Sequence, residues 1–463
     1  MRRPLSPLYA LALALVVPLA AAQDRVPAGE PVPVDGQEPV EGQEPAHEPV
    51  QEQEPAPGEQ AQAPGEEDRE AHDSAVPLDE IRRFVAVYKA VKQAYVEPVE
   101  DHELMQAAVR GLLLDLDPHS AYLAGDDAES FDEQTRGNYG GLGVEILRLP
   151  DGTLRVIAPF DDTPAARAGI VAGDLIVAVD GVPLTPTTTE EAVPLRGEPG
   201  TTVELTVVRE GEDEPLELSL EREVIRIASV RSRMLEPGYG YLRLVAFQTD
   251  TAAEFERQLQ QLQDESGGRL RGLVIDVRSN PGGLLTSAVQ IADALLEDGL
   301  IVTTRGRTPI SDASFSATPG DRLDGAPVVV LVDAGSASAS EVLAGALADN
   351  GRATVVGSRT FGKGSVQTVL PLDNGDSVKL TTARYYTPDG TSIQATGIVP
   401  EVVFQSTDAE DDGEGSGYSV PTEASLPGHL EGLEEGGSAG EVLGGDGYID
   451  QALAELKARA AAG

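Results

Sequence analysis

The stretch APVVVLVDAGSAS, residues 326–338, decides the fold of this chain. Its apolar run is typical of a strand that is buried on both faces, and the small residues at its end lead into a helical pattern over about 339–348. The same order occurs upstream, where RGLVIDVRSNPGGLL (271–285) runs through a Pro-Gly-Gly turn into a helical pattern over 286–296. Buried strands that alternate with helices predict an α/β domain whose sheet has covered faces.

Serines alternate with alanines directly after this strand, in GSASASE (335–341). Ser338 is predicted to lie where the strand meets the helix, and a helix N-terminus can stabilise the oxyanion of an acyl-transfer reaction. The neighbouring alanines leave room for a peptide backbone. Ser336 and Ser340 stay open as alternative nucleophiles, in which case Ser338 would only cap the helix.

A serine nucleophile needs a base, and the chain has no histidine between Ser120 and Gly428. Lys363, in the glycine-flanked segment FGKGSVQ (361–367), is the obvious proton acceptor. An amine can accept a proton only when neutral, and burial lowers its pKa toward neutrality. Lys363 and Gln367 are four residues apart, so in a strand or a helix they would share a face.

A different unit begins at Gly137 and ends near Glu223. YGGLGVEI (139–146) is predicted to form strand structure, and TPAARAGIVAGDLIVAVDGVPL (163–184) a short helix, a strand and a tight Asp-Gly turn. LRGEPGT (195–201) leads into the last strands. In this order the motifs resemble a PDZ domain of the rearranged bacterial kind.

The glycines of this unit predict a carboxylate site. Gly140, Gly141 and Gly143 allow the backbone to turn sharply. The amides of Leu142, Gly143 and Val144 can then point at one spot, which would bind a peptide C-terminal carboxylate. The adjoining strand edge would accept the peptide as an added strand. A glycine-rich hairpin without a ligand is the alternative.

The composition excludes several functions. The net charge of −44 argues against nucleic acid as a partner. Residues 24–77 hold 15 acidic and 2 basic side chains with repeated QEP and EPV units, which predicts a disordered, self-repelling tether. The chain has no cysteine, no HExxH motif and scattered histidines, so we expect no metal site and no cofactor.

The N-terminus is predicted to be a secretory signal peptide. Arg2 and Arg3 form its positive region, and the apolar stretch 10–22 ends in an A-x-A pattern. This stretch is short for a bilayer span, so we expect cleavage after Ala22 rather than a retained anchor. An exported, soluble protein of a periplasm-like compartment fits best.

Together the motifs resemble the carboxyl-terminal processing peptidases, or tail-specific proteases. The motifs NYGGLGVEI, DTPAARAGIVAGDLI, LRGEPGT, DVRSNPGG, GSASASE, FGKGSVQ and YYTPDGTSIQATGIVPE occur in order over 78–404. The resemblance implies a serine endopeptidase with an α/β core of the ClpP/crotonase type, N-terminal helices and an inserted PDZ domain that engages substrate C-termini. It implies Ser338 as the nucleophile, Lys363 as the general base and Gln367 as the residue that orients the lysine.

The resemblance also implies an oxyanion hole. The backbone amide of Ala339 and that of either Gly282 or Gly283 would form it. Arg196 is expected either to link the PDZ domain, where the substrate tail binds, to the protease core or to lie in a surface turn. The expected substrates are proteins or peptides with free, apolar C-termini. The protein is also expected to form a homo-oligomer or to bind an adaptor protein.

The predicted domains are a signal peptide (1–22), an acidic linker (23–77), a helical region (78–136), the PDZ domain (137–223), the protease core (224–404), an acidic glycine-rich linker (405–445) and a C-terminal helix (446–463). Two other functions stay open. One is a catalytically inactive PDZ adaptor of the same fold, and the other is a non-proteolytic enzyme on the same sheet, for example a hydratase of acyl-CoA type. Export and the peptide-binding unit argue against the latter.

Overall fold

The computed structural model describes residues 76–188, 195–212, 214–404, 421–433 and 438–462. The chain divides into a unit over 19–108 and a larger unit that holds 109–463. The predicted signal peptide lies outside the described residues, and so does the predicted acidic linker except for its last two residues. In the parts of the chain that the structure describes, no helix is long and apolar enough to cross a bilayer.

The smaller unit contains α2 (Leu78–Ala94) and the start of α3 (Asp101–Leu114). The amphipathic spacing of the sequence predicts α2, and the helix is present. None of its residues is buried, and Ile81 and Phe84 keep 43% and 45% of their surface exposed. The apolar face of α2 is therefore open to solvent in the described structure.

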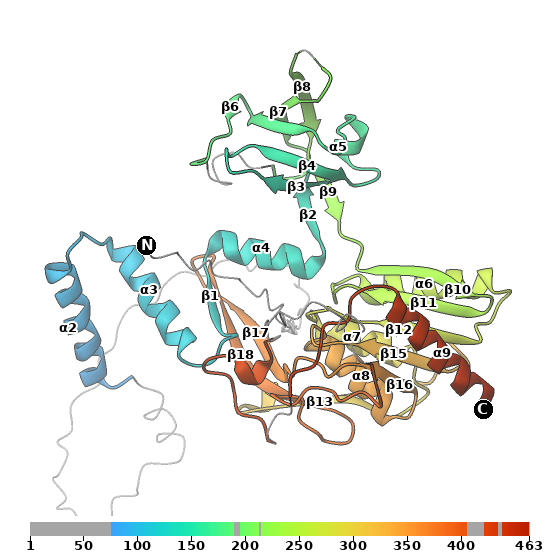
Figure 1. Ribbon diagram of the computed structural model, residues 1–463. Coiled ribbons are helices and arrows are strands. Elements are labelled where there is room, and N and C mark those ends of the chain that lie inside the picture. The colour runs from blue at the N-terminus through green and yellow to red at the C-terminus, as the bar shows by residue number, and fades with distance from the viewer. Residues whose placement is uncertain (1–75, 189–194, 213, 405–420, 434–437, 463) are drawn as a thin grey trace, which may run out of the picture. The chain divides into compact units, whose positions relative to one another are not determined.

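A six-stranded sheet forms the centre of the larger unit (Figure 1). Its strands are, in spatial order, β10 (Val230–Glu236), β11 (Tyr239–Leu244), β12 (Gly272–Asp276), β15 (Val328–Val332), β16 (Ala353–Gly357) and β19 (Val402–Val403). All neighbours from β11 to β19 are parallel, and only β10 is antiparallel to β11. Every residue of β12 and β15 is buried, because parallel strands of this kind are covered on both faces.

Helices cover both faces of the central sheet. Helices α6 (Thr251–Glu265), α7 (Leu285–Asp293) and α8 (Ala339–Asp349) pack on one face in a shared apolar core. Helix α9 (Gly447–Ala462) packs on the other face, where Leu456 is fully buried (Figure 1). The α/β fold predicted from the alternation of strands and helices is confirmed.

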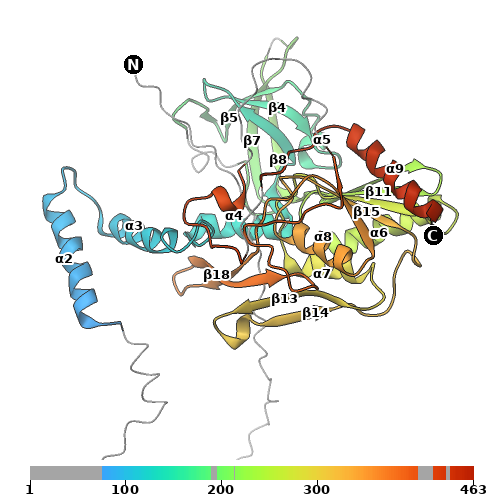
Figure 2. The same cartoon turned by 60° about the horizontal axis from the view of Figure 1, so that its bottom comes forward.

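The sequence predicts that residues 365–386 continue the central sheet, but these residues belong to a second sheet. Instead β17 (Ser365–Pro371) and β18 (Ser377–Tyr386) form an antiparallel hairpin. The sheet also contains β1 (Ala121–Leu123), β13 (Leu300–Gly306) and β14 (Ala313–Ser316). Helices α7 and α8 lie between this sheet and the central one (Figure 2). Because the turn after β17 is short, β18 is the nearest strand with which β17 can pair. In the central sheet, the edge of β16 is already paired with β19.

The region predicted to be a PDZ domain has a sheet and a core of its own. The sheet has the order β3 (Val144–Arg148), β4 (Leu154–Pro159), β5 (Leu175–Val179), β7 (Thr202–Val208) and β8 (Leu216–Glu221), with β6 (Val182–Pro183) beside β5. The short helix α5 (Pro164–Arg167) adds Ala165 to the core. Strands β2 (Asn138–Gly141) and β9 (Glu223–Arg226) pair where the chain enters and leaves this region.

The tail also needs a correction. Residues 405–445 were predicted to be an acidic linker, but the described parts of that interval pack on the core. Glu423, in the short helix η3 (Glu423–Ser425), is fully buried, and Leu443 is 2% exposed. The Glu441 amide donates to Ser358 Oγ at 2.6 Å. The acidic composition is misleading here, because the Glu423 carboxylate has buried partners that lie far away in the sequence.

Candidate active site

Ser338 occupies the junction between β15 and α8. Its backbone has φ 57° and ψ −113°, which costs a non-glycine residue on the order of 1–3 kcal/mol. Its Oγ is buried and has no hydrogen-bond partner among the described residues. By contrast, Ser336 Oγ donates to the Val277 carbonyl at 2.8 Å, and Ser340 Oγ donates to the Asn280 carbonyl at 2.9 Å. Of the three serines, only Ser338 has a hydroxyl that donates no hydrogen bond to a carbonyl of the described residues.

The carboxylate of Glu341, in the first turn of α8, joins the serine to the lysine segment. Its Oε2 accepts the Ser338 amide at 2.7 Å and the Lys363 amide at 2.9 Å. Its Oε1 accepts the Gly362 amide at 2.7 Å and Thr360 Oγ1 at 2.5 Å. Burial raises the pKa of Glu341 to about 7, and these hydrogen bonds oppose that shift. Glu341 therefore caps α8 through the Ser338 amide, and it also brings the serine and lysine segments together.

Lys363 lies just before β17 and is 1% exposed. Burial, together with the charge of Lys379, lowers the pKa of Lys363 from an ordinary 10.5 to about 8. The carboxylates of Glu423, Asp117 and Glu341 oppose this effect. Lys363 therefore has the burial that the sequence reasoning required, and a substantial neutral fraction exists near neutral pH.

Gln367 is fully buried in β17, but it does not hold the lysine in this structure. Its Nε2 donates to Ser365 Oγ at 3.0 Å and to Thr381 Oγ1 at 3.2 Å, and its Oε1 has no partner among the described residues. Lys363 lies outside the strand, and a β-bulge directly precedes Gln367, so their spacing in sequence does not set a common face. Since Ser338 Oγ and Gln367 Oε1 both lack partners, neither is hydrogen-bonded to Lys363.

The predicted oxyanion residues lie next to one another. A Cβ atom on Gly282 would come within 3.1 Å of the Ala339 nitrogen, so only glycine allows this approach. The Gly282 amide already donates to Asn280 Oδ1 at 2.9 Å. Gly283 forms a parallel bridge with Phe247, in which the Gly282 carbonyl accepts the Phe247 amide at 2.9 Å and the Leu284 amide donates to the Phe247 carbonyl at 2.7 Å, so the Gly283 N–H takes no part in it. This arrangement favours Gly283 over Gly282 as the donor.

Sequence reasoning missed one hydroxyl and misjudged one buried network. Tyr385, in β18, has a buried hydroxyl without a hydrogen-bond partner among the described residues and lies close enough to Ser338 to interact electrostatically. Burial raises the pKa of Tyr385 well above its usual value. The segment LDPHS (116–120) predicts Asp117 and Ser120 as helix caps and a structural role for His119, but these residues precede β1, and Asp117 and His119 join a network with Glu423. The motifs YYTPDG and LDPHS mark these positions, yet only the fold brings them together.

The predicted carboxylate site has the expected backbone. Leu142 and Gly143 connect β2, which ends at Gly141, to β3, which begins at Val144. Gly143 has φ 70°, and a Cβ atom there would lie 2.4 Å from Thr163, so glycine is required. The amides of Leu142 and Gly143 donate no hydrogen bond among the described residues. β3 is an edge strand, so its free side can accept a peptide, whereas the Leu142 side chain is 2% exposed in the core and forms no pocket wall.

Arg196 contacts the strand that precedes this turn and the helix α4 (Gly125–Arg136) before it. Its guanidinium forms an ion pair with Glu133 of α4 at 3.2 Å and stacks on the Tyr139 ring at 4.6 Å. Arg196 therefore links the PDZ region to the helix that precedes it, while about 61% of its side chain stays exposed. The neighbouring Gly197 amide donates to the Gly140 carbonyl at 3.1 Å, so Gly140 serves a close backbone contact with the LRGEPGT segment.

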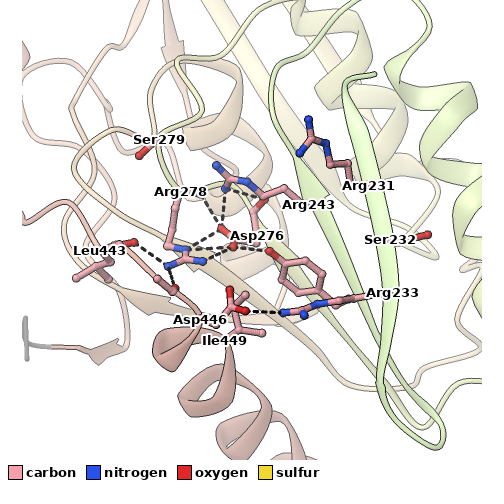
Figure 3. A pocket seen from close by; sticks show the side chains of 13 residues that line it. Arg231, Ser232, Arg233, Arg243, Asp276, Arg278, Ser279, Leu443, Asp446 and Ile449 are labelled. Atoms are coloured by element: carbon pink, nitrogen blue, oxygen red, sulfur yellow. Dashed lines mark hydrogen bonds and ion pairs between the residues drawn. The ribbon is translucent and has the colours of Figure 1, made fainter. Parts of the chain in front are cut away.

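A cavity of about 490 Å³ lies on the α9 side of the central sheet, apart from the residues described above (Figure 3). Arg278 and Arg243 both bind Asp276 there, at 2.7 and 2.8 Å. Arg278 also donates to the carbonyls of Leu443 and Gly445 at 2.7 and 3.0 Å. These contacts give Asp276 and Arg278 a structural role, since they attach the tail to the sheet.

Comparisons with known proteins agree with this geometry. Residues 238–404 match the profile of peptidase family S41, and residues 140–220 match that of the PDZ domain. Residues 46–127 match the profile of the activating protease CtpB N-terminal domain, a match that begins inside the predicted acidic linker.

The chain is similar to several named proteases. It is 42% identical over 359 residues to the carboxy-terminal-processing protease of Bartonella bacilliformis, covering 77% of this chain and 82% of that protein. It is 32% identical over 354 residues to the carboxy-terminal processing protease CtpB of Bacillus subtilis, covering 75% and 70%. Among solved structures, the photosystem II D1 C-terminal processing protease is 31% identical over 75% of this chain and 98% of that chain, with a TM-score of 0.42.

The match to peptidase family S41, together with the PDZ domain and the named protease relatives, identifies a serine-type peptidase that acts on proteins or peptides. The chain belongs to the carboxy-terminal processing proteases of peptidase family S41. The family predicted from the sequence motifs is confirmed.

Proposed function

We propose that this peptidase cleaves peptide bonds with Ser338 as the nucleophile and Lys363 as the general base. One observation carries the assignment. Among the neighbouring serines, Ser338 alone has a hydroxyl that donates to no carbonyl of the described residues, and its amide shares a carboxylate oxygen of Glu341 with the amide of Lys363.

In the proposed reaction the neutral Lys363 amine takes the proton from Ser338 Oγ as that oxygen attacks the scissile carbonyl carbon. The amides of Ala339 and Gly283 stabilise the negative oxygen of the tetrahedral intermediate. Lys363 then gives its proton to the leaving amine, and the C–N bond breaks to leave an acyl-enzyme. Water, deprotonated by the same lysine, releases the product and restores the serine.

We propose that substrate binding completes this site. The unpartnered Gln367 Oε1 is a buried acceptor, and a buried acceptor without a donor costs about 1–3 kcal/mol. A shift of the Lys363 side chain would let its neutral amine donate an N–H to Gln367 Oε1 and direct its lone pair at Ser338 Oγ. Catalytic hydrogen bonds often tighten only when substrate is bound.

The test is cleavage of an unfolded exported protein by the chain from Gln23 onward, with products identified by mass spectrometry. The Ser338→Ala variant must be inactive while its circular dichroism spectrum matches that of the parent. A catalytically dead adaptor would give no products with either protein, and cleavage by Ser338→Ala would refute the nucleophile.

We propose that the PDZ domain selects substrates by a free C-terminus with an apolar final residue. The two unpaired amides of Leu142 and Gly143 and the open edge of β3 support this role. The side chains of Val144 and Ile146, which are partly exposed on β3, are candidates for the apolar wall.

We propose further that the protein is exported to a periplasm-like compartment after cleavage at Ala22, and that it works as a homo-oligomer or with an adaptor protein. The exposed apolar face of α2 supports a partner contact. N-terminal sequencing of the protein recovered from its native cells tests the cleavage, because a mature chain would begin at Gln23. Light scattering coupled to gel filtration tests the oligomeric state.

A further inference from the structure

The C-terminal tail delivers a buried carboxylate to the neighbourhood of the lysine. Glu423 is fully buried, and its Oε2 and Oε1 lie 2.8 and 3.0 Å from His119 Nε2. Its Oε1 also accepts Gln394 Nε2 at 2.9 Å, and its own amide donates to the Phe361 carbonyl at 3.1 Å. Residues 304 positions apart in the chain thus meet at one carboxylate.

Gln394 extends this contact to the other side of the lysine. Its Oε1 accepts the Gly364 amide at 3.0 Å. A Cβ atom on Gly364 would lie 2.3 Å from the Gln394 nitrogen, so the two backbones are in direct contact. The tail therefore holds the chain through Phe361, two residues before Lys363, and through Gly364, one residue after it.

Four ionisable side chains from four elements act electrostatically on the pKa of Lys363. Glu341 belongs to α8, Glu423 to the tail, Asp117 to the loop before β1, and Lys379 to β18. Asp117 is held in place, since it accepts the amides of His119 and Ser120 at 2.8 and 2.9 Å and Thr381 Oγ1 at 3.0 Å. Glu423 differs from the other carboxylates because the tail supplies it.

We propose that Glu423 is a positioning residue for Lys363, so that the protease is competent only when the segment around η3 is docked on the core. The inference rests on the proposed Ser/Lys mechanism. The main-chain amide of Glu423 binds the Phe361 carbonyl before the lysine. Its carboxylate binds Gln394, which in turn binds the Gly364 amide after the lysine. Its negative charge also raises the pKa of Lys363.

The test is the pH dependence of kcat/KM for Glu423→Gln, with Glu431→Gln as the matched control because Glu431 is an exposed glutamate of the same tail. Loss of a negative charge beside Lys363 favours its neutral form, so the acid limb should move to lower pH by about half a unit or more. Loosening the segment should lower the alkaline plateau at least about tenfold. Glu431→Gln should leave both unchanged.

A lower plateau with an unmoved acid limb would mean that Glu423 only supports folding, and it would overturn the proposal. An unchanged profile would overturn it as well. If Glu423→Gln does not fold, Gln394→Met carries the test, because it cuts the link to Gly364 without removing a charge. The folded Gln394→Met protein must lose at least about tenfold in kcat/KM, and full activity refutes the proposal.

A second measurement separates this proposal from the proposed function. The Ser338→Ala protein labelled with [13C]lysine reports the titration of Lys363 by NMR without any proteolysis, and the signal is assigned by its loss in Lys363→Met. Glu423→Gln in this background must lower the Lys363 midpoint. If the Lys363 midpoint falls but the activity of the parent enzyme does not depend on Lys363, the Ser/Lys mechanism is wrong and the positioning role of Glu423 stands.

Discussion

At the scale of single residues, the three serines of GSASASE differ in what their hydroxyls do. Ser338→Ala should abolish proteolysis with little loss of stability, because its Oγ makes no hydrogen bond among the described residues. Ser336→Ala and Ser340→Ala should keep substantial activity but each lose about 0.5–1.5 kcal/mol of unfolding free energy, since each removes a buried hydrogen bond to a carbonyl. Peptide cleavage assays and urea unfolding of the three variants check this. Activity in Ser338→Ala, with loss in either neighbour, would move the nucleophile.

Lys363 should give the activity its pH dependence. The neutral amine is the active form and its pKa is lowered to about 8, so kcat/KM should rise with pH and reach half its plateau near that value. Lys363→Arg and Lys363→Ala should both lose most activity, because a guanidinium stays protonated and alanine has no base. Lys89→Arg, at an exposed lysine of α2, is the control. A fully active Lys363→Arg enzyme would rule out the dyad.

The same burial has a consequence for stability. Between pH 8 and 10.5 the unfolded chain keeps a proton on Lys363 that the folded chain has released. The contribution of Lys363 to the unfolding free energy therefore increases with pH across that window. The Ser338→Ala protein, which cannot digest itself, should show this rise relative to its Lys363→Met derivative in urea unfolding at a series of pH values. Parallel pH curves for the two would contradict a lowered pKa.

At the scale of elements, the turn between β2 and β3 is the proposed point of substrate selection. A peptide with a C-terminal amide should bind the isolated PDZ region (137–226) roughly 5- to 150-fold more weakly than the free acid, since an unpaired carboxylate site typically loses about 1–3 kcal/mol. The fragment includes β9 because β9 pairs with β2. Titration calorimetry with matched peptides measures this, and equal affinities would exclude carboxylate capture.

Arg196 belongs to the same scale. Its ion pair with Glu133 and its stacking on Tyr139 join the LRGEPGT segment to α4 and β2. Arg196→Ala should therefore leave peptide affinity in the isolated PDZ region nearly unchanged and slow cleavage by the whole enzyme. Comparing calorimetry with cleavage rates distinguishes the two effects. A large loss of peptide affinity in Arg196→Ala would instead make Arg196 part of the binding site.

At the scale of the whole molecule, the tail is part of the protease core. Helix α9 buries Ile449, Ala452 and Leu456 against the central sheet, and Arg278 anchors the segment before it. A chain that ends at Phe404 should unfold at clearly lower urea concentration, because each large buried side chain contributes about 1.5–3 kcal/mol. Leu456→Ala should cost about 2–5 kcal/mol and Glu431→Ala very little. An unchanged urea midpoint for the truncated chain would restore the linker interpretation.

The sequence alone was sufficient for the local structure and for the type of chemistry. Apolar runs with small residues at their ends predicted β12, β15 and the helices that follow, because periodicity and residue size act over neighbouring positions. Ser338 could be found because it lies at such a junction. Lys363 could be found because the region holds no histidine that could act as base.

Only the tertiary structure decided which distant residues share one buried site. Glu423 meets His119 across 304 positions, and no local pattern encodes that pairing. Acidic composition predicted a solvated linker there, but a carboxylate with several buried donors is stable in the interior. Gln367 lacks its expected contact with Lys363 because a bulge and a strand boundary lie between them. Sequence spacing fixes a face only within one regular element, whereas burial and long-range hydrogen bonds depend on how the elements pack.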